Sequence, residues 1–541
     1  MLRNVLHDAM VWIGVAIGLG FQLPARAADA DPTKKDAHET AAEIDRRLEA
    51  HWQAKGITPA AAASEVTVFR RLMLDLAGRI PTRAECEAYL AEKAAPEERY
   101  RQAVQRILAG PEFALHQGAV LEEMLQGDSA GNPEFTDYLR RSLRERKGWD
   151  ALFRELLVGP WKTDDLKPAT RFLEVRAKDL DRLTTDATRV FFGVDVSCAR
   201  CHDHPLVDDW KQDHYYGMAS FFNRTSGGKG SIGEKFEGDV SFKSIDGTQK
   251  TAALMFLSGR VATEPPPEEA KKTKFSRREQ LVAIALEDKA FLSRSLVNRL
   301  WQQYFGRGLV HPVDQIHSSN PPSVPGLLEY LADDFADSGY DLQRLIGAIV
   351  STKAYRLSSR WDSAAPLPEE GDFAASRLRL LSPRQYAMSL LVATGRAEFG
   401  PADALQARAE KLAGSEGVGR VAQYLAAEEQ ARPLFSQIDP TEGGQSSADE
   451  ALYLSNSAAI QTLVSAEEGT LAARLAEMSD DRSIAEAAIR HVYCRPPDEG
   501  EIERLAGWLD EQSQAPSFEK VRTCEQIVWI LVTSAEFRFQ H

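Results

Sequence analysis

The chain has 541 residues, enough for roughly two to four domains of ordinary size. Its hydrophobic fraction of 43% and charged fraction of 27% are those of a globular protein, which excludes wholesale disorder and collagen-like repetition. Acidic residues outnumber basic residues by 80 to 65, a net charge of −15, so no nucleic-acid partner is predicted, because such binding needs a cationic surface. Five cysteines are too few for a disulfide-stapled scaffold.

An export signal is predicted at the start of the chain. Arg3 precedes an uncharged apolar stretch from Ala9 to Phe21, and Ala25-Arg26-Ala27 gives a small-x-small cleavage pattern. We expect residues 1–27 to be a cleaved signal peptide, with an uncleaved membrane anchor as the alternative. No later stretch approaches 18 uninterrupted apolar residues, so no integral membrane span is predicted after cleavage. The predicted location is periplasmic or secreted, where thiols meet an oxidising compartment.

Helical periodicity dominates the rest of the chain, so the predicted fold class is mainly α. Apolar residues at helical spacing predict a helix over 327–335 that is ended by Gly339, and another over 342–350 with Asp341 as its N-cap. The segment 292–305 is apolar over a wide arc, as expected of a helix buried between neighbours.

The helical pattern is interrupted between residues 225 and 275. A Gly-rich segment at 226–230 opens the interruption and a run of three prolines at 265–267 closes it. Between them, residues 240–244 alternate in polarity and Asp246-Gly247 is a hairpin-type turn signal. We predict a small β excursion and a Pro/Gly-rich linker at 225–275, joining a helical domain at 28–224 to a second one at 276–541.

A short internal repeat links the two ends of the chain. Residues 79–85 align without gaps with residues 495–501, and each segment has the pattern of a helix capping box. Each is followed by an apolar helix and then by a Glu-Phe pair, at Glu112-Phe113 and Glu536-Phe537. Two similar helix pairs are predicted, the alternative being that good helix starts resemble one another.

The strongest chemical signal is Cys198-Ala-Arg-Cys201-His202. Two thiols three residues apart on one turn lie near the same edge, where both can reach the vinyl groups of a porphyrin. The adjacent His202 is then placed to bind the iron as the proximal ligand. The sequence therefore predicts covalent haem c on Cys198 and Cys201.

Three other interpretations of this motif stay open. An oxidising compartment permits a local Cys198–Cys201 disulfide with His202 incidental. Together with His204, the same residues could hold zinc or copper. A thioredoxin-like dithiol is disfavoured because no βαβ pattern surrounds it.

Met218 is the nearest candidate for a distal ligand of the iron, the alternative being that a Met at this helical spacing packs in the core. It follows His202 by sixteen residues, whereas His204 is too close to reach the opposite haem face. The alternatives are His214, Met255 and an open position. Asp203 is expected to accept a hydrogen bond from the ligating imidazole or to lie at the surface.

The other three cysteines offer weaker signals. Cys494 and Cys524 are candidates to pair across neighbouring C-terminal helices. Cys86 lies within an apolar helical pattern and is predicted to be buried and inert.

Longer motifs resemble a known family. Residues 70–78, with Pro81-Thr82 after them, resemble the opening of a secreted domain that is abundant in planctomycetes and associated with planctomycete-type cytochrome c modules. The hallmark of that domain is similar to residues 198–205 followed by Asp213, residues 215–217 and Phe221-Phe222. The second half resembles its usual partner domain of unknown function, on residues 298–301, 305–308, 320–322 and 534–537. The resemblance implies export and a link to cytochromes but no assigned reaction, and the family pattern includes His204, which keeps the metal alternative open.

The leading hypothesis is an exported haem c-binding protein that takes part in electron transfer or in a haem-dependent redox reaction, with a periplasmic redox partner. Whether the chain is an enzyme is left open. The alternatives are a non-catalytic cell-surface or assembly protein with a structural Cys/His metal site or disulfide, and a copper-dependent oxidoreductase.

Overall fold

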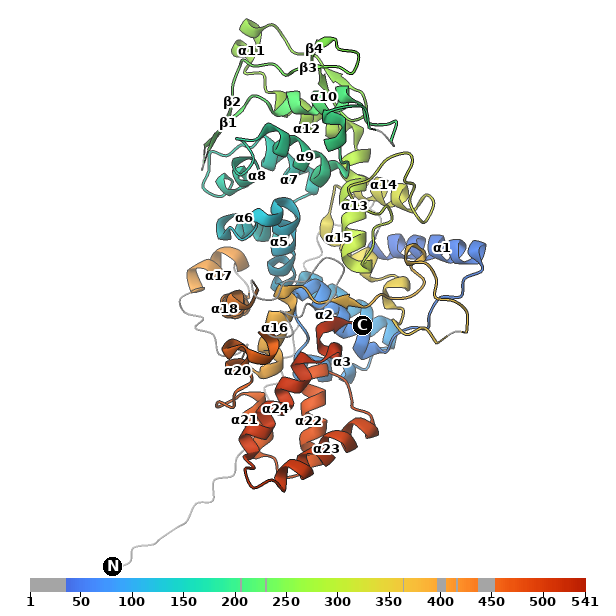
Figure 1. Ribbon diagram of the computed structural model, residues 1–541, viewed down its shortest axis with the longest axis vertical. Coiled ribbons are helices and arrows are strands. Elements are labelled where there is room, and N and C mark those ends of the chain that lie inside the picture. The colour runs from blue at the N-terminus through green and yellow to red at the C-terminus, as the bar shows by residue number, and fades with distance from the viewer. Residues whose placement is uncertain are drawn as a thin grey trace, which may run out of the picture.

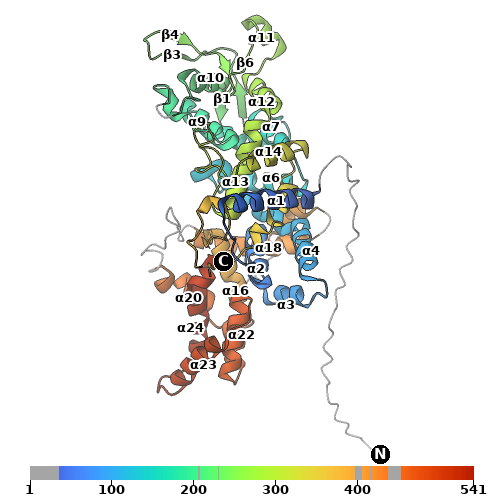
Figure 2. The ribbon, with the colours of Figure 1, turned by 90° about the vertical axis from the view of Figure 1, so that its right-hand side faces the viewer.

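The computed structural model describes residues 36–204, 207–228, 231–362, 364–396, 405–414, 417–435 and 453–541. The predicted signal peptide, residues 1–27, lies outside these residues. The molecule is elongated, with short strands at one end and the C-terminal helices at the other (Figure 1). A view turned by 90° shows the same order of elements along the long axis (Figure 2).

The N-terminal part of the chain forms the first ten helices. They are Ala37–Lys55 (α1), Glu65–Ala77 (α2), Arg83–Ala91 (α3), Pro96–Ala109 (α4), Pro111–Gln126 (α5), Pro133–Arg144 (α6), Trp149–Leu157 (α7), Arg171–Glu174 (α8), Leu180–Phe192 (α9) and Gln212–Phe222 (α10). Their buried apolar residues belong to one large core, which fixes the position of the predicted haem motif between α9 and α10.

The predicted β excursion is confirmed as a row of small antiparallel hairpins. Thr225–Gly228 (β1) pairs with Ser231–Glu234 (β2), Ser241–Lys243 (β3) with Gln249–Thr251 (β4), and Leu254–Met255 (β5) with Val261–Ala262 (β6). The Asp246-Gly247 turn closes the second hairpin, where the Asp246 carboxylate accepts from the Ser244 hydroxyl at 2.6 Å and the Thr248 amide at 2.9 Å. Pro267–Thr273 (α11) follows.

Four further helices return to the first core. They are Arg277–Asp288 (α12), Ala290–Phe305 (α13), Leu327–Asp337 (α14) and Leu342–Val350 (α15). The predicted caps are present, because the Asp341 side chain accepts from the Arg344 amide at 3.0 Å and Gly339 takes a left-handed φ of +76°. Trp301, near the C-terminal end of α13, is fully buried and stacks on Phe305, as predicted for a helix between neighbours.

The C-terminal part forms a second core. Its helices are Pro383–Thr394 (α16), Gln406–Ala413 (α17), Val418–Phe435 (α18), Ala458–Val464 (α20), Leu471–Glu477 (α21), Asp481–Tyr493 (α22), Glu499–Ser513 (α23), Lys520–Thr533 (α24) and Ala535–Arg538 (α25). Arg379–Leu380 (β7) pairs with Phe539–Gln540 (β8). The mainly α fold is thus confirmed, but the two cores do not divide the chain at the β excursion, because α12 to α15 pack into the first core.

The internal repeat has a matching structure at both ends of the chain. The Arg79 guanidinium donates to Glu85 at 2.8 Å and lies 2.9 Å from Glu112. The Arg495 guanidinium donates to Glu501 at 2.6 and 2.7 Å and to Glu536 at 2.5 and 2.7 Å. Capping boxes begin both α3 and α23. The two ends of the chain therefore share the same side-chain contacts as well as the same kind of helix start.

Candidate functional site

The haem motif lies on a short turn between two helices of the first core. Helix α9 ends at Gly193, whose φ is +67° and where a Cβ would lie 2.6 Å from Cδ1 of Ile316. The chain then forms a β-bridge between Val194 and Gln315, followed by the 3-10 turn Ser197–Arg200. Val196 and Ala199 are buried beneath the turn, so this arrangement directs the cysteines outward.

Cys198 and Cys201 are both exposed and both free thiols. The turn that carries them is held to α10 by two hydrogen bonds to main-chain oxygens. The Gln212 side chain donates to the Cys201 carbonyl at 3.1 Å, and the Tyr216 hydroxyl donates to the Arg200 carbonyl at 2.9 Å. The turn therefore offers two accessible sulfurs on an anchored backbone.

His202 follows directly and is also exposed. Its Nδ1 lies 2.7 Å from the main-chain oxygen of Asp203, a contact that a protonated Nδ1 makes as a donor. In that tautomer Nε2 keeps its lone pair for a metal, the arrangement that metal-binding histidines use. Of the two positions expected for the Asp203 side chain, the structure has the surface one: it is exposed and accepts from the Gln212 main-chain amide at 3.0 Å at the start of α10.

The candidate distal ligands lie in different surroundings. Met218 is fully buried in the first core, on the face of α10 opposite to solvent. Met255, in β5, packs against Gly217 of α10. A Cβ added at Gly217 would lie only 2.8 Å from the Cβ of Met255. His214 is half-buried, which lowers its pKa, and its Nδ1 accepts from the Lys211 amide at 3.2 Å. The distal ligand stays a prediction.

The donor set of the motif fits haem c at the positions described. Two accessible thiols and an imidazole with a free Nε2 are the groups that covalent attachment and proximal ligation require. His204 is half-buried and its amide donates to the Trp210 carbonyl at 2.8 Å. Over the described ranges, no group of three or more His, Cys, Asp or Glu residues is placed to hold a metal ion. The zinc and copper alternatives also stay predictions.

The aromatic residues after the motif serve mainly as core. Trp210, Tyr215, Phe221 and Phe222 are buried, and Tyr216 stacks on Phe242 of β3 with centroids 4.1 Å apart. The motif is therefore carried by a rigid packed surface.

The predicted pairing of Cys494 with Cys524 is wrong. Both are free thiols, and Cys494 instead shares a hydrogen bond with Cys86 from the other end of the chain. This neighbouring thiol, together with burial, raises the pKa of Cys86. The Cys494 thiol also donates to the Pro81 carbonyl at 3.0 Å, just before α3. Cys86 is buried, as predicted, but it has a partner that the sequence did not indicate.

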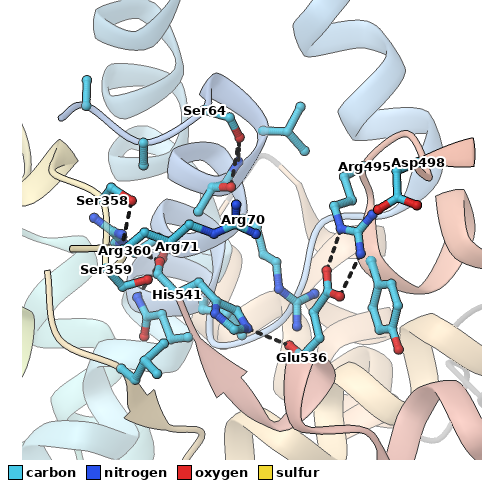
Figure 3. Close-up of a pocket in the computed structure, with 18 of the residues that line it drawn as sticks. Ser64, Arg70, Arg71, Ser358, Ser359, Arg360, Arg495, Asp498, Glu536 and His541 are labelled. Carbon is cyan, nitrogen blue, oxygen red and sulfur yellow. Dashed lines mark hydrogen bonds and ion pairs between the residues drawn. The ribbon is translucent and has the colours of Figure 1, made fainter. Parts of the chain in front are cut away.

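A cavity of about 680 Å³ lies between α2, the segment Ser358–Arg360 and the C-terminal half of the internal repeat, and sequence reasoning did not find it. Figure 3 shows Arg70 between the segment Ser358–Arg360 on one side and Arg495 with Glu536 on the other. The only sequence signal was a pair of arginines, Arg70 and Arg71, inside an otherwise apolar stretch of α2.

No helix in the described part of the chain is both long and apolar enough to cross a membrane.

Comparison with known proteins gives two family matches. Residues 43–227 match the family model PSCyt2, described as a protein of unknown function (DUF1549). Residues 277–509 match PSD1, described as a protein of unknown function (DUF1553). No curated protein and no solved structure matches the chain significantly. The chain is thus similar, over two successive stretches, to a pair of families of unknown function.

Proposed function

We propose that this chain is an exported protein that binds one haem c covalently through Cys198 and Cys201 and takes part in electron transfer or in a haem-dependent redox reaction. The observation that carries the proposal is the exposed turn on which both free thiols precede an exposed His202. The name of the matched family, PSCyt2, points to an association with cytochromes and supports the same function.

The chain's own residues would each have a defined task. Cys198 and Cys201 would form the two thioether bonds, and His202 would bind the iron through Nε2. The Asp203 carbonyl, 2.7 Å from Nδ1, would orient the imidazole and strengthen it as a ligand. A bound haem supplies one-electron redox chemistry.

A haem stain after denaturing electrophoresis tests the attachment, because thioether-linked haem survives unfolding. The protein is produced with its N-terminal segment in a host that matures cytochromes c. We expect a haem-positive band for the natural chain and for Cys524→Ala, a control that removes a buried thiol far from the motif. The double variant Cys198→Ala/Cys201→Ala should give protein without stain.

Two results would overturn the proposal. One is a natural protein without stain, and metal analysis would then separate a zinc or copper site from a scaffold without metal. The other is a double variant that keeps its covalent haem.

The distal role predicted for Met218 has its own test. Met218 is fully buried, so binding iron would require a rearrangement around α10. Met218→Leu conserves volume but removes the thioether. A changed visible spectrum and potential identifies Met218 as the ligand, and unchanged values exclude it.

The proposed partner is a periplasmic redox protein with a basic surface. The net charge of −15 would attract such a partner and speed encounter. Electron transfer to a basic acceptor should then slow as ionic strength rises, whereas a rate independent of salt would exclude electrostatic attraction.

A further inference from the structure

The cavity between α2, the segment Ser358–Arg360 and the C-terminal half of the repeat contains a buried arginine that forms no ion pair within the described residues. Arg70 is 7% exposed, and its Nη2 donates to the Phe537 carbonyl at 3.1 Å. Its Nη1 has no hydrogen-bond partner, and no carboxylate of the described residues forms an ion pair with it. Burying an uncompensated charge costs several kcal/mol, so this is an unusual place for a guanidinium without a bound anion.

The carboxylates of the cavity are already used by other groups. Glu501 and Glu536 each accept two hydrogen bonds from Arg495. Asp498 accepts from the Glu501 amide at 2.7 Å and so caps α23. Glu536 stabilises the charge of Arg70 through space, but none of these carboxylates accepts a hydrogen bond from Arg70 or forms an ion pair with it.

Other basic groups lie on the same side of the cavity. Arg71 is 2% exposed and donates to main-chain oxygens of Tyr355, Leu357 and His541. Arg360 is exposed at the rim, next to Ser359. Figure 3 shows Arg71 beside Arg70, with Arg360 and Ser359 next to Arg71. The positive charge on this side favours a negative ligand.

We propose that this cavity binds a small oxyanion, a carboxylate or a tetrahedral phosphate or sulfate group, on the guanidinium of Arg70. The planar guanidinium can give two parallel hydrogen bonds to either kind of anion. A volume of about 680 Å³ lies in the range of small-molecule sites and leaves room for an organic remainder. The inference does not depend on haem binding.

The test uses the full chain in phosphate, sulfate, acetate and chloride at equal ionic strength, with thermal unfolding and calorimetric titration. At least one of the first three anions should raise the melting temperature above its value in chloride and bind with one site per chain. A response to acetate alone identifies a carboxylate ligand, and a response to phosphate or sulfate identifies a tetrahedral one.

Variants assign the response to Arg70. In Arg70→Met the anion response should disappear, while the melting temperature in chloride stays the same or rises, because an unpaired buried charge has been removed. Arg83→Met, an exposed control that makes the same charge change outside the cavity, should respond like the natural chain.

Three results would overturn the proposal. The first is a natural chain whose melting temperature and calorimetric signal do not respond to any of the three anions. The second is an Arg70→Met variant that responds to the anions as the natural chain does. Arg70→Lys keeps the charge but loses the planar fork, so its affinity should fall about tenfold. An unchanged affinity in Arg70→Lys would contradict the proposal even where Arg70→Met does not fold.

Discussion

His116 shows what burial does to a single titratable group. Burial, together with repulsion from Arg384, lowers the pKa of His116 to about 3 from an ordinary 6.5. The His116 ring packs against Gly78, where a Cβ would lie only 2.3 Å from Nδ1. A protonated Nδ1 would therefore have no room for a water molecule beside it. As the pH falls, His116 is protonated near pH 6.5 in the unfolded chain but only near pH 3 in the folded chain.

The stability of the fold should therefore depend on His116 in mildly acidic solution. The contribution is constant above pH 6.5 and is lost as the pH falls from there toward 3. Between pH 7 and pH 5 the natural chain should lose about 2 kcal/mol of unfolding free energy through this group. In His116→Gln the loss of unfolding free energy between pH 7 and pH 5 should be smaller by that amount. Urea unfolding at the two pH values measures both losses. Equal losses in both chains would contradict this assignment.

At the level of residues, the sequence predicted what depends on local spacing. Cys198, Cys201 and His202 could be named as a candidate site because they lie three and one residues apart, and the structure places all three, exposed, on or beside one turn. Arg70 was missed because its lack of a counter-ion depends on groups near residues 360, 495 and 541. The contact of Cys86 with Cys494 was missed for the same reason, since 408 residues separate them (494 minus 86).

The two arginine-centred repeats are expected to stabilise their elements to different degrees. The Arg79 side chain is 11% exposed and the Arg495 side chain 29%. Lysine cannot reproduce the bidentate contacts of either. Arg79→Lys should lower the free energy of unfolding by about 1–3 kcal/mol, and Arg495→Lys by less because solvent screens it.

Urea unfolding measures both losses against Arg83→Lys, a control in an exposed pair on α3 that should cost no more than about 0.5 kcal/mol. A loss for Arg79→Lys no larger than that of the control would show that the repeated contacts do not hold the helices.

Elements were the most predictable level of this molecule. The caps of α14 and α15, the capping boxes of α3 and α23 and the hairpin at Asp246-Gly247 were all predicted, because each depends on a few neighbouring residues. The helix pairs of the repeat were predicted as well. In each helix pair one arginine binds two glutamates that are far apart in the sequence, and this contact could only be seen in the tertiary structure.

The two cores are joined by a buried ionic contact. Glu428 of α18 is 3% exposed and accepts from Arg140 of α6 at 2.6 Å and from Arg384 of α16. Burial would raise the pKa of Glu428, but the charges of Arg140 and Arg384 lower it to about 2. Glu428→Gln removes the buried counter-ion of Arg140, leaving only the longer contact with Asp137 at 3.4 Å, and should cost about 3–5 kcal/mol of unfolding free energy.

Glu429→Gln is the matched control for Glu428→Gln. Its side chain is 51% exposed, so the change should stay within about 0.5 kcal/mol. Equal unfolding midpoints for the two variants would exclude the buried contact as a link between the cores.

The contact of Cys86 with Cys494 links the two ends of the chain. With glutathione disulfide, the two thiols should form one disulfide, giving up two protons and two electrons while the oxidant leaves as two glutathione thiols. The experiment uses Cys198→Ala/Cys201→Ala, which removes the exposed thiols. Peptide mapping without reductant should find Cys86 joined to Cys494. A disulfide between Cys494 and Cys524 would contradict the contact. So would Cys86 and Cys494 staying reduced in the folded protein under conditions that fully oxidise the unfolded chain.

The arrangement of the whole molecule was the least predictable level. The β excursion at 225–275 looked like a separation between two cores, yet α12 to α15 pack into the first core and α2 and α5 contribute Leu74 and Leu115 to the second. A local pattern shows that a helix has an apolar face but not which core that face joins.

Covalent haem on the Cys198–Cys201 turn adds a fixed mass to the exported, purified protein, which intact mass spectrometry measures. We expect the mass of the processed chain plus one haem for the natural protein, and the mass of the chain alone for Cys198→Ala/Cys201→Ala. A natural protein whose mass equals that of its residues would contradict the covalent attachment.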